Sequence, residues 1–262
     1  MTPAPFVMRR GSGVPVLFVH GNGVDHRALL PLDDVFADGW ERISFDLPGF
    51  GGTPALGAPG GLPQLADWLD ATVGELVGTT PFALVGSSLG GLLAREIAAR
   101  RPAQCLGMAL LAPVVDSVHE HRTLPATVVL HEAPALLAEL PPEAAAPYAQ
   151  LAGVQSRENW ERFRDSILPG LHAADARAMA RLSMDYALPE LPDERLASFD
   201  RPVLIVAGRQ DWVVGFEDQW ALAQRLPHAT YAMLDRAGHN IEADQPEAVR
   251  GLLAHWAAQI VV

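Results

Sequence analysis

The sequence predicts an α/β protein, built from a mostly parallel sheet with helices packed on both of its faces. Short apolar runs alternate along the chain with longer segments in which apolar residues recur at helical spacing. Several of the short runs are apolar throughout, which is typical of strands buried on both faces of a parallel sheet. The length of 262 residues suits one large domain with an insertion, because a domain averages about 150 residues.

Six apolar runs are the predicted strands, and four longer segments are the predicted helices of the sheet. The strands are Val14–Val19, Ile43–Phe45, Phe82–Val85, Leu106–Leu111, Val203–Ala207 and Thr230–Leu234. The helices cover about Leu62–Val77, Leu89–Arg101, Glu217–Leu226 and Pro246–Ile260. In the first helix Leu65, Leu69 and Val73 share one face, and Pro246 suits the first turn of the last helix.

One segment, residues 115–199, breaks this alternation. It has no convincing strand pattern and is rich in Ala, Leu, Glu, Arg and Pro. Helices are predicted near residues 135–140, 143–151, 158–167 and 173–185, and prolines such as Pro141 and Pro169 keep them short. We therefore expect residues 1–114 and 200–262 to form the core, with residues 115–199 as a helical insertion between two of its strands.

The composition excludes several classes of function. Nineteen Lys and Arg against 31 Asp and Glu give a net charge of −12, so neither nucleic acid nor a membrane is an expected partner. The single cysteine, Cys105, rules out an internal disulfide and a cysteine zinc site. No apolar run approaches the ~20 residues that span a bilayer. Arg9-Arg10 precede a short apolar run with no small-residue cleavage site, so we expect a cytoplasmic location.

The clearest chemical motif follows the predicted strand Phe82–Val85. There the chain reads Gly86-Ser87-Ser88-Leu89-Gly90 and enters a predicted helix, which is the G-x-S-x-G pattern in a strand–turn–helix setting. Such a turn pushes the central side chain outward on a strained backbone, so the residues two before and two after must be very small. Ser88 is therefore the predicted nucleophile, and a glycine turn that serves packing alone is the alternative.

A serine nucleophile needs a base, and the base needs an acid that orients it. His239 lies in a glycine-bearing loop between the last predicted strand and the last helix, from which it can reach towards Ser88. Asp211 follows the strand Val203–Ala207 and precedes the histidine, which gives the order Ser, Asp, His. Asp116 is the competing acid, and a turn or helix-capping role is the alternative for Asp211.

The negative oxygen that forms during acyl transfer needs two N–H donors. The backbone amide of Leu89, directly after the nucleophile, is one expected donor. We assign the other to the amide of Asn22, because the turn His20-Gly21-Asn22-Gly23 follows a strand on the same side of the sheet. A glycine-rich turn without a chemical role is the alternative.

Two further features have weaker patterns. Trp160 and Trp212 are predicted to line a substrate pocket, with ordinary packing as the alternative. His119-Glu120-His121 offers metal-binding side chains, but no third ligand is evident in the sequence. We therefore expect no metal, and a solvated entry to the insertion at this position.

Taken together, these motifs resemble the α/β-hydrolase family. The matching motifs stand in the family's order over about residues 14–260: His20-Gly21, Phe45–Gly51, Gly86–Gly91, Gly208-x-x-Asp211 and Gly238-His239. The resemblance implies the α/β-hydrolase fold, a Ser88–His239–Asp211 triad, a cap formed by the insertion, and no cofactor. Leu47–Gly51 and Ser88–Leu92 look most like small bacterial carboxylesterases such as the pimeloyl-carrier methyl-ester esterases. Similar epoxide hydrolases and haloalkane dehalogenases carry Asp at the elbow, so Ser88 argues against both.

The predicted reaction is acyl transfer to water. Ser88 attacks a carbonyl while His239 takes its proton, and water then hydrolyses the acyl-serine. The expected substrate is a small to medium carboxylic ester or thioester, acted on by a monomer or homodimer. Two alternatives stay open: carbon–carbon bond hydrolysis of a vinylogous diketone with the same triad, and a non-catalytic small-molecule receptor. An intact triad argues against the receptor, because a receptor needs the pocket and not the nucleophile.

Overall fold

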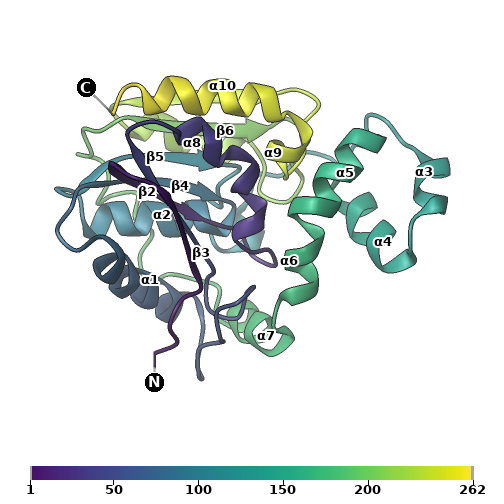
Figure 1. The fold of residues 1–262 in the computed structure, drawn as a ribbon. Coiled ribbons are helices and arrows are strands. Elements are labelled where there is room, and N and C mark those ends of the chain that lie inside the picture. Colours follow the sequence, from purple (N-terminus) through teal and green to yellow (C-terminus); the bar gives the residue numbers. More distant parts are fainter. Residues whose placement is uncertain (1, 261–262) are drawn as a thin grey trace.

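A seven-stranded sheet forms the centre of the computed structural model, which describes residues 2–260 (Figure 1). The strands lie in the order β1-β3-β2-β4-β5-β6-β7, and every neighbouring pair is parallel except β1 with β3. Their bounds are β1 Val7–Gly11, β2 Val14–Val19, β3 Trp40–Phe45, β4 Phe82–Ser87, β5 Cys105–Leu111, β6 Val203–Gly208 and β7 Ala229–Leu234. The predicted fold class is confirmed.

All six predicted strands form, and β1 is the strand that the hydrophobic pattern did not predict. Its residues Arg9 and Arg10 are exposed, and it pairs with β3 at the edge of the sheet. An edge strand that buries few side chains needs no apolar run, so apolar periodicity is a poor guide to it. By contrast β4 and β6 are buried along their whole length, as expected for central parallel strands.

Helices cover both faces of the sheet (Figure 1). α10 (Pro246–Ala257) packs with the 3-10 helix η2 (Leu30–Phe36) on one face, and α1 (Leu62–Val77) packs with α2 (Leu89–Arg100) on the other. α8 (Glu217–Arg225) follows β6 and contacts β7. Two shorter helices complete this part, η1 His26–Ala28 and α9 Ile241–Asp244, and a third, η3 His119–His121, opens the segment after β5.

Between β5 and β6 the chain runs through the 3-10 helix η3 and then five α-helices, α3 to α7, which lie beyond one end of the strands (Figure 1). Their bounds are α3 Pro134–Glu139, α4 Pro142–Leu151, α5 Arg157–Ser166, α6 Leu168–Ala173 and α7 Ala176–Met184. In residues 115–199 the structure forms no strand, and a single isolated bridge joins His131 to Val154. The predicted helix at 173–185 begins later, because the Asp175 side chain caps the amide of Ala178. The short helix α6 precedes it and was not predicted.

Two apolar clusters stabilise the structure. The larger lies between the sheet and its helices and contains buried residues of every central strand, such as Leu84 and Ile205. The smaller joins α3, α4, α5 and α6 to η1 around the rings of Tyr148, Trp160 and Phe163. The insertion therefore has a core of its own that extends onto the loop after β2. None of the helices in residues 2–260 is long and apolar enough to cross a bilayer.

Candidate active site

Ser88 occupies the sharp turn between β4 and α2. Its backbone has φ 54° and ψ −117°, a conformation that side-chain-bearing residues rarely adopt. A β-carbon at Gly90 would lie 2.0 Å from the Val19 carbonyl oxygen, and one at Gly86 would lie 2.4 Å from the Gly90 carbonyl oxygen. Only glycine fits at these two positions, which is the physical reason for the pattern seen in the sequence.

Ser88, His239 and Asp211 form one chain of hydrogen bonds across three loops. His239 Nε2 lies 2.9 Å from Ser88 Oγ, and His239 Nδ1 lies 3.0 Å from Asp211 Oδ2. The three residues follow β4, β7 and β6, so all stand at the carboxyl ends of parallel strands. The structure thus brings together the three side chains that the sequence predicts to act as a unit.

The carboxylate of Asp211 is fully buried and is held by two backbone amides. Its Oδ1 accepts hydrogen bonds from Val213 N at 2.9 Å and Val214 N at 3.1 Å, which leaves Oδ2 for His239. The competing acid Asp116 is held elsewhere: it accepts from the Val118 amide and lies 3.0 Å from His121 Nδ1. The geometry therefore favours Asp211 as the acid that orients His239.

Nearby negative charge sets the protonation of His239. Burial lowers the pKa of its imidazole, but the charge and hydrogen bond of Asp211, helped by Glu242, raise that pKa above its ordinary value. Because Asp211 accepts at Nδ1, the neutral ring carries its proton there and leaves the Nε2 lone pair facing Ser88. The ring can therefore accept the hydroxyl proton of Ser88.

Two backbone segments lie close to Ser88, and they carry the two residues predicted to supply oxyanion donors. A β-carbon at Gly21 would lie 3.1 Å from Ser88 Cβ, so the loop after β2 passes close to the nucleophile. Asn22, the next residue, lines the same cavity as Ser88. Leu89 is the first residue of α2, where backbone amides have no partner within their own helix. The backbone segments that carry Asn22 and Leu89 thus approach Ser88 from two different elements.

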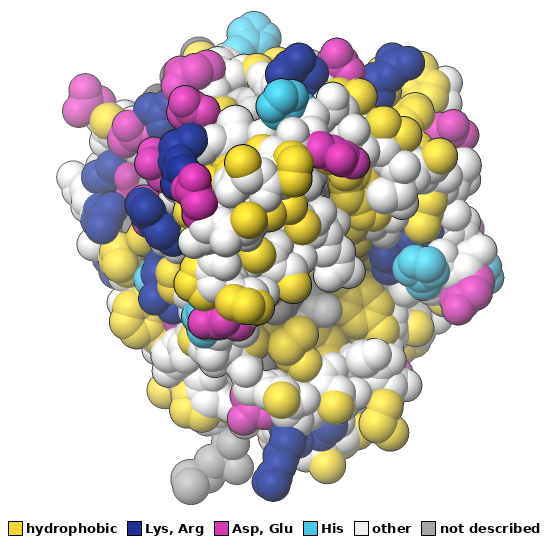
Figure 2. Space-filling model, turned by 90° about the vertical axis from the view of Figure 1, so that its right-hand side faces the viewer, with side chains coloured by type: hydrophobic (Ala, Val, Ile, Leu, Met, Phe, Trp, Pro, Cys, Tyr) yellow, Lys and Arg dark blue, Asp and Glu magenta, His cyan; other side chains and the backbone are white. Residues whose placement is uncertain are grey.

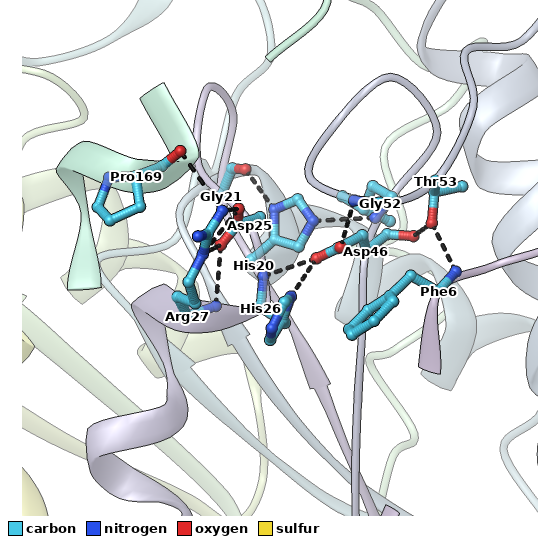
Figure 3. A network of polar contacts seen from close by, with 11 residues as sticks. Phe6, His20, Gly21, Asp25, His26, Arg27, Asp46, Gly52, Thr53 and Pro169 are labelled. Atoms are coloured by element: carbon cyan, nitrogen blue, oxygen red, sulfur yellow. Dashed lines mark hydrogen bonds and ion pairs between the residues drawn. The ribbon is translucent and has the colours of Figure 1, made fainter. Parts of the chain in front are cut away.

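The side chain of His20 fixes the conformation of the loop after β2 (Figure 3). Its Nε2 accepts a hydrogen bond from Leu47 N at 2.9 Å, so its proton resides on Nδ1, which donates to the Gly21 carbonyl at 2.8 Å. Burial lowers the pKa of His20, which keeps the ring neutral and preserves this arrangement. The loop that carries Asn22 is therefore tied to the segment after β3.

Two buried carboxylates extend this network (Figure 3). Asp46 accepts hydrogen bonds from the amides of His26 and Gly52 and contacts the His26 ring, while Asp25 pairs with Arg27. Asp25, His26 and Asp46 also present three potential metal ligands within 4.8 Å of one another. Both carboxylates already accept from protein donors, so their chemistry fits a hydrogen-bond network that supports the loop rather than a metal site.

A cavity of about 670 Å³ opens above Ser88, between the ends of the strands and the insertion. Figure 2 shows that this face of the molecule is hollowed and that hydrophobic side chains line the hollow. The volume is in the range of sites that hold small ligands. The insertion helices and the turn that follows them contribute Leu151, Ile167, Leu171, Ser183, Tyr186 and Ala187 to the lining.

The two tryptophans predicted to line this cavity are not among its lining residues. Trp160 packs in the smaller apolar cluster, with its ring centre 5.3 Å from that of Tyr148. Burial of this large ring stabilises the insertion from inside, so its position serves packing. Trp212 lies in the turn after Asp211, and the residues that follow it, Val213 and Val214, line the cavity in its place.

Two acids after His239 belong to the site and were not identified from the sequence. Burial raises the pKa of Glu242 to about 7 and that of Asp244 to about 6. Glu242 lines the cavity, and Asp244 accepts hydrogen bonds from the Gly238 amide and from the Asn159 side chain of α5. Their sequence signal, acids at the start of a helix, is equally typical of exposed helix termini.

A serine, an acid and a histidine in this order, at the carboxyl ends of a mostly parallel sheet, define the α/β-hydrolase class. Residues 14–246 match the family model described as the α/β hydrolase fold, and the chain belongs to this family. The predicted resemblance is therefore confirmed, and the family is one of hydrolases.

Curated relatives span nearly the whole chain at modest identity. The (E)-2-((N-methylformamido)methylene)succinate hydrolase of Acinetobacter baylyi is 25% identical over 252 residues, which cover 94% of this chain and 91% of the relative. A pimeloyl-[acyl-carrier protein] methyl ester esterase of Shewanella sp. is 27% identical over 278 residues, which cover 98% of this chain and 96% of the relative. A solved α/β superfamily hydrolase from Oenococcus oeni has a TM-score of 0.90 and 26% identity over the full length of both chains.

Proposed function

We propose that this protein is a serine hydrolase that cleaves a carboxylic ester or thioester of a small to medium molecule through an acyl-Ser88 intermediate. One observation carries the proposal: the hydrogen-bonded chain from Ser88 through His239 to buried Asp211, at the base of the cavity. The similarity to an esterase over nearly the full length supports the same reaction class.

In the first half of the reaction, Ser88 Oγ attacks the carbonyl carbon as His239 Nε2 takes the hydroxyl proton. Asp211 stabilises the imidazolium that forms and keeps its orientation. The amides of Asn22 and Leu89 donate to the negatively charged oxygen of the tetrahedral intermediate. His239 then returns the proton to the departing alcohol or thiol, which leaves an acyl group on Ser88.

In the second half, water attacks the acyl carbonyl and gives its proton to His239. The same two amides stabilise the second tetrahedral intermediate, and His239 protonates Ser88 Oγ as the carboxylic acid leaves. The helical insertion acts as a cap in this proposal, because it supplies one wall of the cavity and none of the three hydrogen-bonded side chains. Substrate choice then depends on the insertion and bond cleavage on the core loops.

Covalent labelling tests the proposal directly. A fluorophosphonate should modify Ser88, as identified by mass spectrometry, and p-nitrophenyl esters of several chain lengths should be hydrolysed. Ser88→Ala should abolish both, whereas Ser198→Ala, a change at an exposed serine outside the cavity lining, should change neither. Labelling at another residue, or unchanged turnover in Ser88→Ala, would refute it.

Carbon–carbon bond hydrolysis is a second candidate reaction. One relative over nearly the full length is named as the hydrolase of a methylenesuccinate and not as an esterase, so the relatives of this chain act on more than simple esters. Carbon–carbon bond hydrolysis of a vinylogous diketone could use the same three side chains. A diketone ring-fission product provides the test, and faster turnover of it than of every ester in the panel would favour this alternative.

A further inference from the structure

The two sides of the cavity differ in chemistry. On the side of β2 and α6 the lining is apolar, with Val24, Ala28, Ile167 and Leu171. On the side of β5 and β6 the lining mixes polar and apolar side chains: Ser117, His119, Glu120 and Arg122 follow β5 together with Val114 and Val118, and Val213 and Val214 follow β6. Ser183 of α7 and Tyr186 after it add two hydroxyl groups to the lining. Ser88 lies between these two sides, because β4 stands between β2 and β5 in the sheet.

One arginine, Arg122, is found among the described residues that line the cavity. Within the part of the chain that the structure describes, no carboxylate forms an ion pair with it. Its guanidinium donates to three backbone carbonyls: Nε to Asp116 at 3.0 Å, Nη1 to Val213 at 3.2 Å and Nη2 to Ser117 at 3.3 Å. A guanidinium has five N–H donors, so these bonds orient it and leave others free. Since carbonyls are neutral, the positive charge is held in place without being neutralised.

The acids of the cavity lining and Asp116 are committed to other groups, exposed to water or partly neutral. The carboxylate of Asp116 accepts from Val118 N and lies against His121. Glu120 is exposed, so solvent screens its charge. Burial raises the pKa of Glu242 to about 7, which leaves a large neutral fraction of this carboxyl near neutral pH.

Arg122 also lies near the reacting groups. The carbonyl that it contacts belongs to Val213, whose amide holds the carboxylate of Asp211. Its positive charge acts to lower the pKa of His239, although the effects of burial and of Asp211 are larger. Tyr186 lines the same cavity as Arg122. Burial raises the pKa of its hydroxyl to about 12, so the group stays protonated and can donate a hydrogen bond to a ligand.

We propose that Arg122, with the hydroxyl of Tyr186, binds a carboxylate of the substrate, so that the enzyme prefers esters with an anionic group at one end and an apolar group at the other. This inference rests on the proposed function and deepens it. A planar guanidinium held in a fixed orientation matches the two oxygens of a carboxylate. The ester carbonyl would then lie at Ser88, between the anion on the β5 side and the apolar group on the β2 side.

Paired substrates test this preference. The first pair is p-nitrophenyl hemiglutarate and p-nitrophenyl valerate, which differ by a carboxylate on the acyl side. The second is 4-carboxyphenyl butyrate and phenyl butyrate, which differ on the alcohol side. Arg122→Gln should lower kcat/KM for the preferred anionic ester by about 10- to 100-fold, the range of a hydrogen bond to a charged group, with the neutral ester changed less than about threefold.

A matched control removes an arginine that also donates to a backbone carbonyl but lies outside this cavity. Arg181 donates to Leu56 O at 2.8 Å, and Arg181→Gln makes the same change in net charge. It should leave the ratio of anionic to neutral kcat/KM unaltered. Added salt should lower kcat/KM for the anionic ester and leave that for the neutral ester unchanged, because salt screens the attraction between Arg122 and the substrate carboxylate.

The outcomes separate the two proposals. If neutral esters are hydrolysed and Ser88 is labelled, but neither anionic ester is preferred or Arg122→Gln leaves the ratios unchanged, the carboxylate site is refuted and the hydrolase proposal stands. If Arg122→Gln lowers kcat/KM equally for the anionic and the neutral ester, then Arg122 serves to hold the loop after β5. That result also refutes the carboxylate site. If no ester is hydrolysed and Ser88 is not labelled, the proposed function itself fails.

Discussion

Replacing Asp211 with Asn should leave His239 in place but remove its ability to act as a base towards Ser88. The two amides of Val213 and Val214 donate to Oδ1, so the carbonyl oxygen of an asparagine must remain at that position. The NH₂ group would then face His239 Nδ1, where Asp211 Oδ2 now lies 3.0 Å away. An NH₂ group donates, so Nδ1 would lose its proton and the neutral ring would carry it on Nε2. That nitrogen would donate to Ser88 Oγ and could no longer accept from it.

The expected loss is large because no water can replace the missing carboxylate at a site that is fully buried. A wrong tautomer combined with an unstabilised imidazolium costs about 10⁴-fold in kcat in comparable triads, or about 5 kcal/mol. The assay is kcat/KM for a p-nitrophenyl ester, with thermal unfolding as the check that the variant folds.

Asp116→Asn is the matched control, because Asp116 was the competing acid and its carboxylate contacts Val118 N and His121. It should change kcat/KM for neutral esters by no more than a few fold. The reasoning is refuted if folded Asp116→Asn is the more damaging variant, or if folded Asp211→Asn loses less than about tenfold.

Three further predictions follow from single contacts. Glu242→Gln should move the acid limb of the pH profile of kcat/KM slightly to lower pH, because the charged form of Glu242 raises the pKa of His239 and only part of this carboxyl is charged near pH 7. Glu161→Gln, at an exposed position of α5, should leave the acid limb in place. Gly90→Ala should lower the free energy of unfolding in urea by at least about 2 kcal/mol, since its β-carbon would lie 2.0 Å from a carbonyl oxygen. Gly251→Ala, with open space around it in α10, should instead stabilise by up to about 1 kcal/mol. Asn159→Ala should lower the free energy of unfolding by about 1–3 kcal/mol, because it leaves an oxygen of the partly buried Asp244 unpaired; an unchanged unfolding curve would contradict this.

The parts of the molecule that could be predicted from sequence are those set by local pattern. Apolar runs locate β2, β4 and β6 because both faces of these strands are buried, and Ser88 and Asp211 come soon after two of them. His239 follows β7, which is only partly buried but still has a strand pattern in the sequence. The failures depend on packing between distant segments. Nothing local to Trp160 says that its ring faces Tyr148 and not the cavity. Likewise Arg122 differs from other arginines through the carbonyls it meets, one of which lies 91 residues away.

The same long-range contacts bear on how the insertion moves. A cap of short helices with few contacts to the core would be expected to open more easily than the sheet. In this structure, however, Asn159 and Arg162 of α5 donate to Asp244 and to the Ala243 carbonyl, in the helix after His239. On the other side of the cavity, Arg27 of η1 donates to the Pro169 carbonyl of α6.

These bonds join the insertion to the loop that carries His239 and to the loop that carries Asn22. Any opening that separates α5 or α6 from the core must break them and would disturb the base and one oxyanion donor together. The insertion therefore affects more than substrate choice, although it contributes no side chain to the hydrogen-bonded chain at Ser88. The part of the wall that contains Ser183, Tyr186 and Ala187 is tied to the core as well, because Leu62 N donates to the Asp185 carbonyl at 2.8 Å. Hydrogen bonds therefore join the insertion to the core on several sides of the cavity, and no single hinge at α5 or α6 would open it.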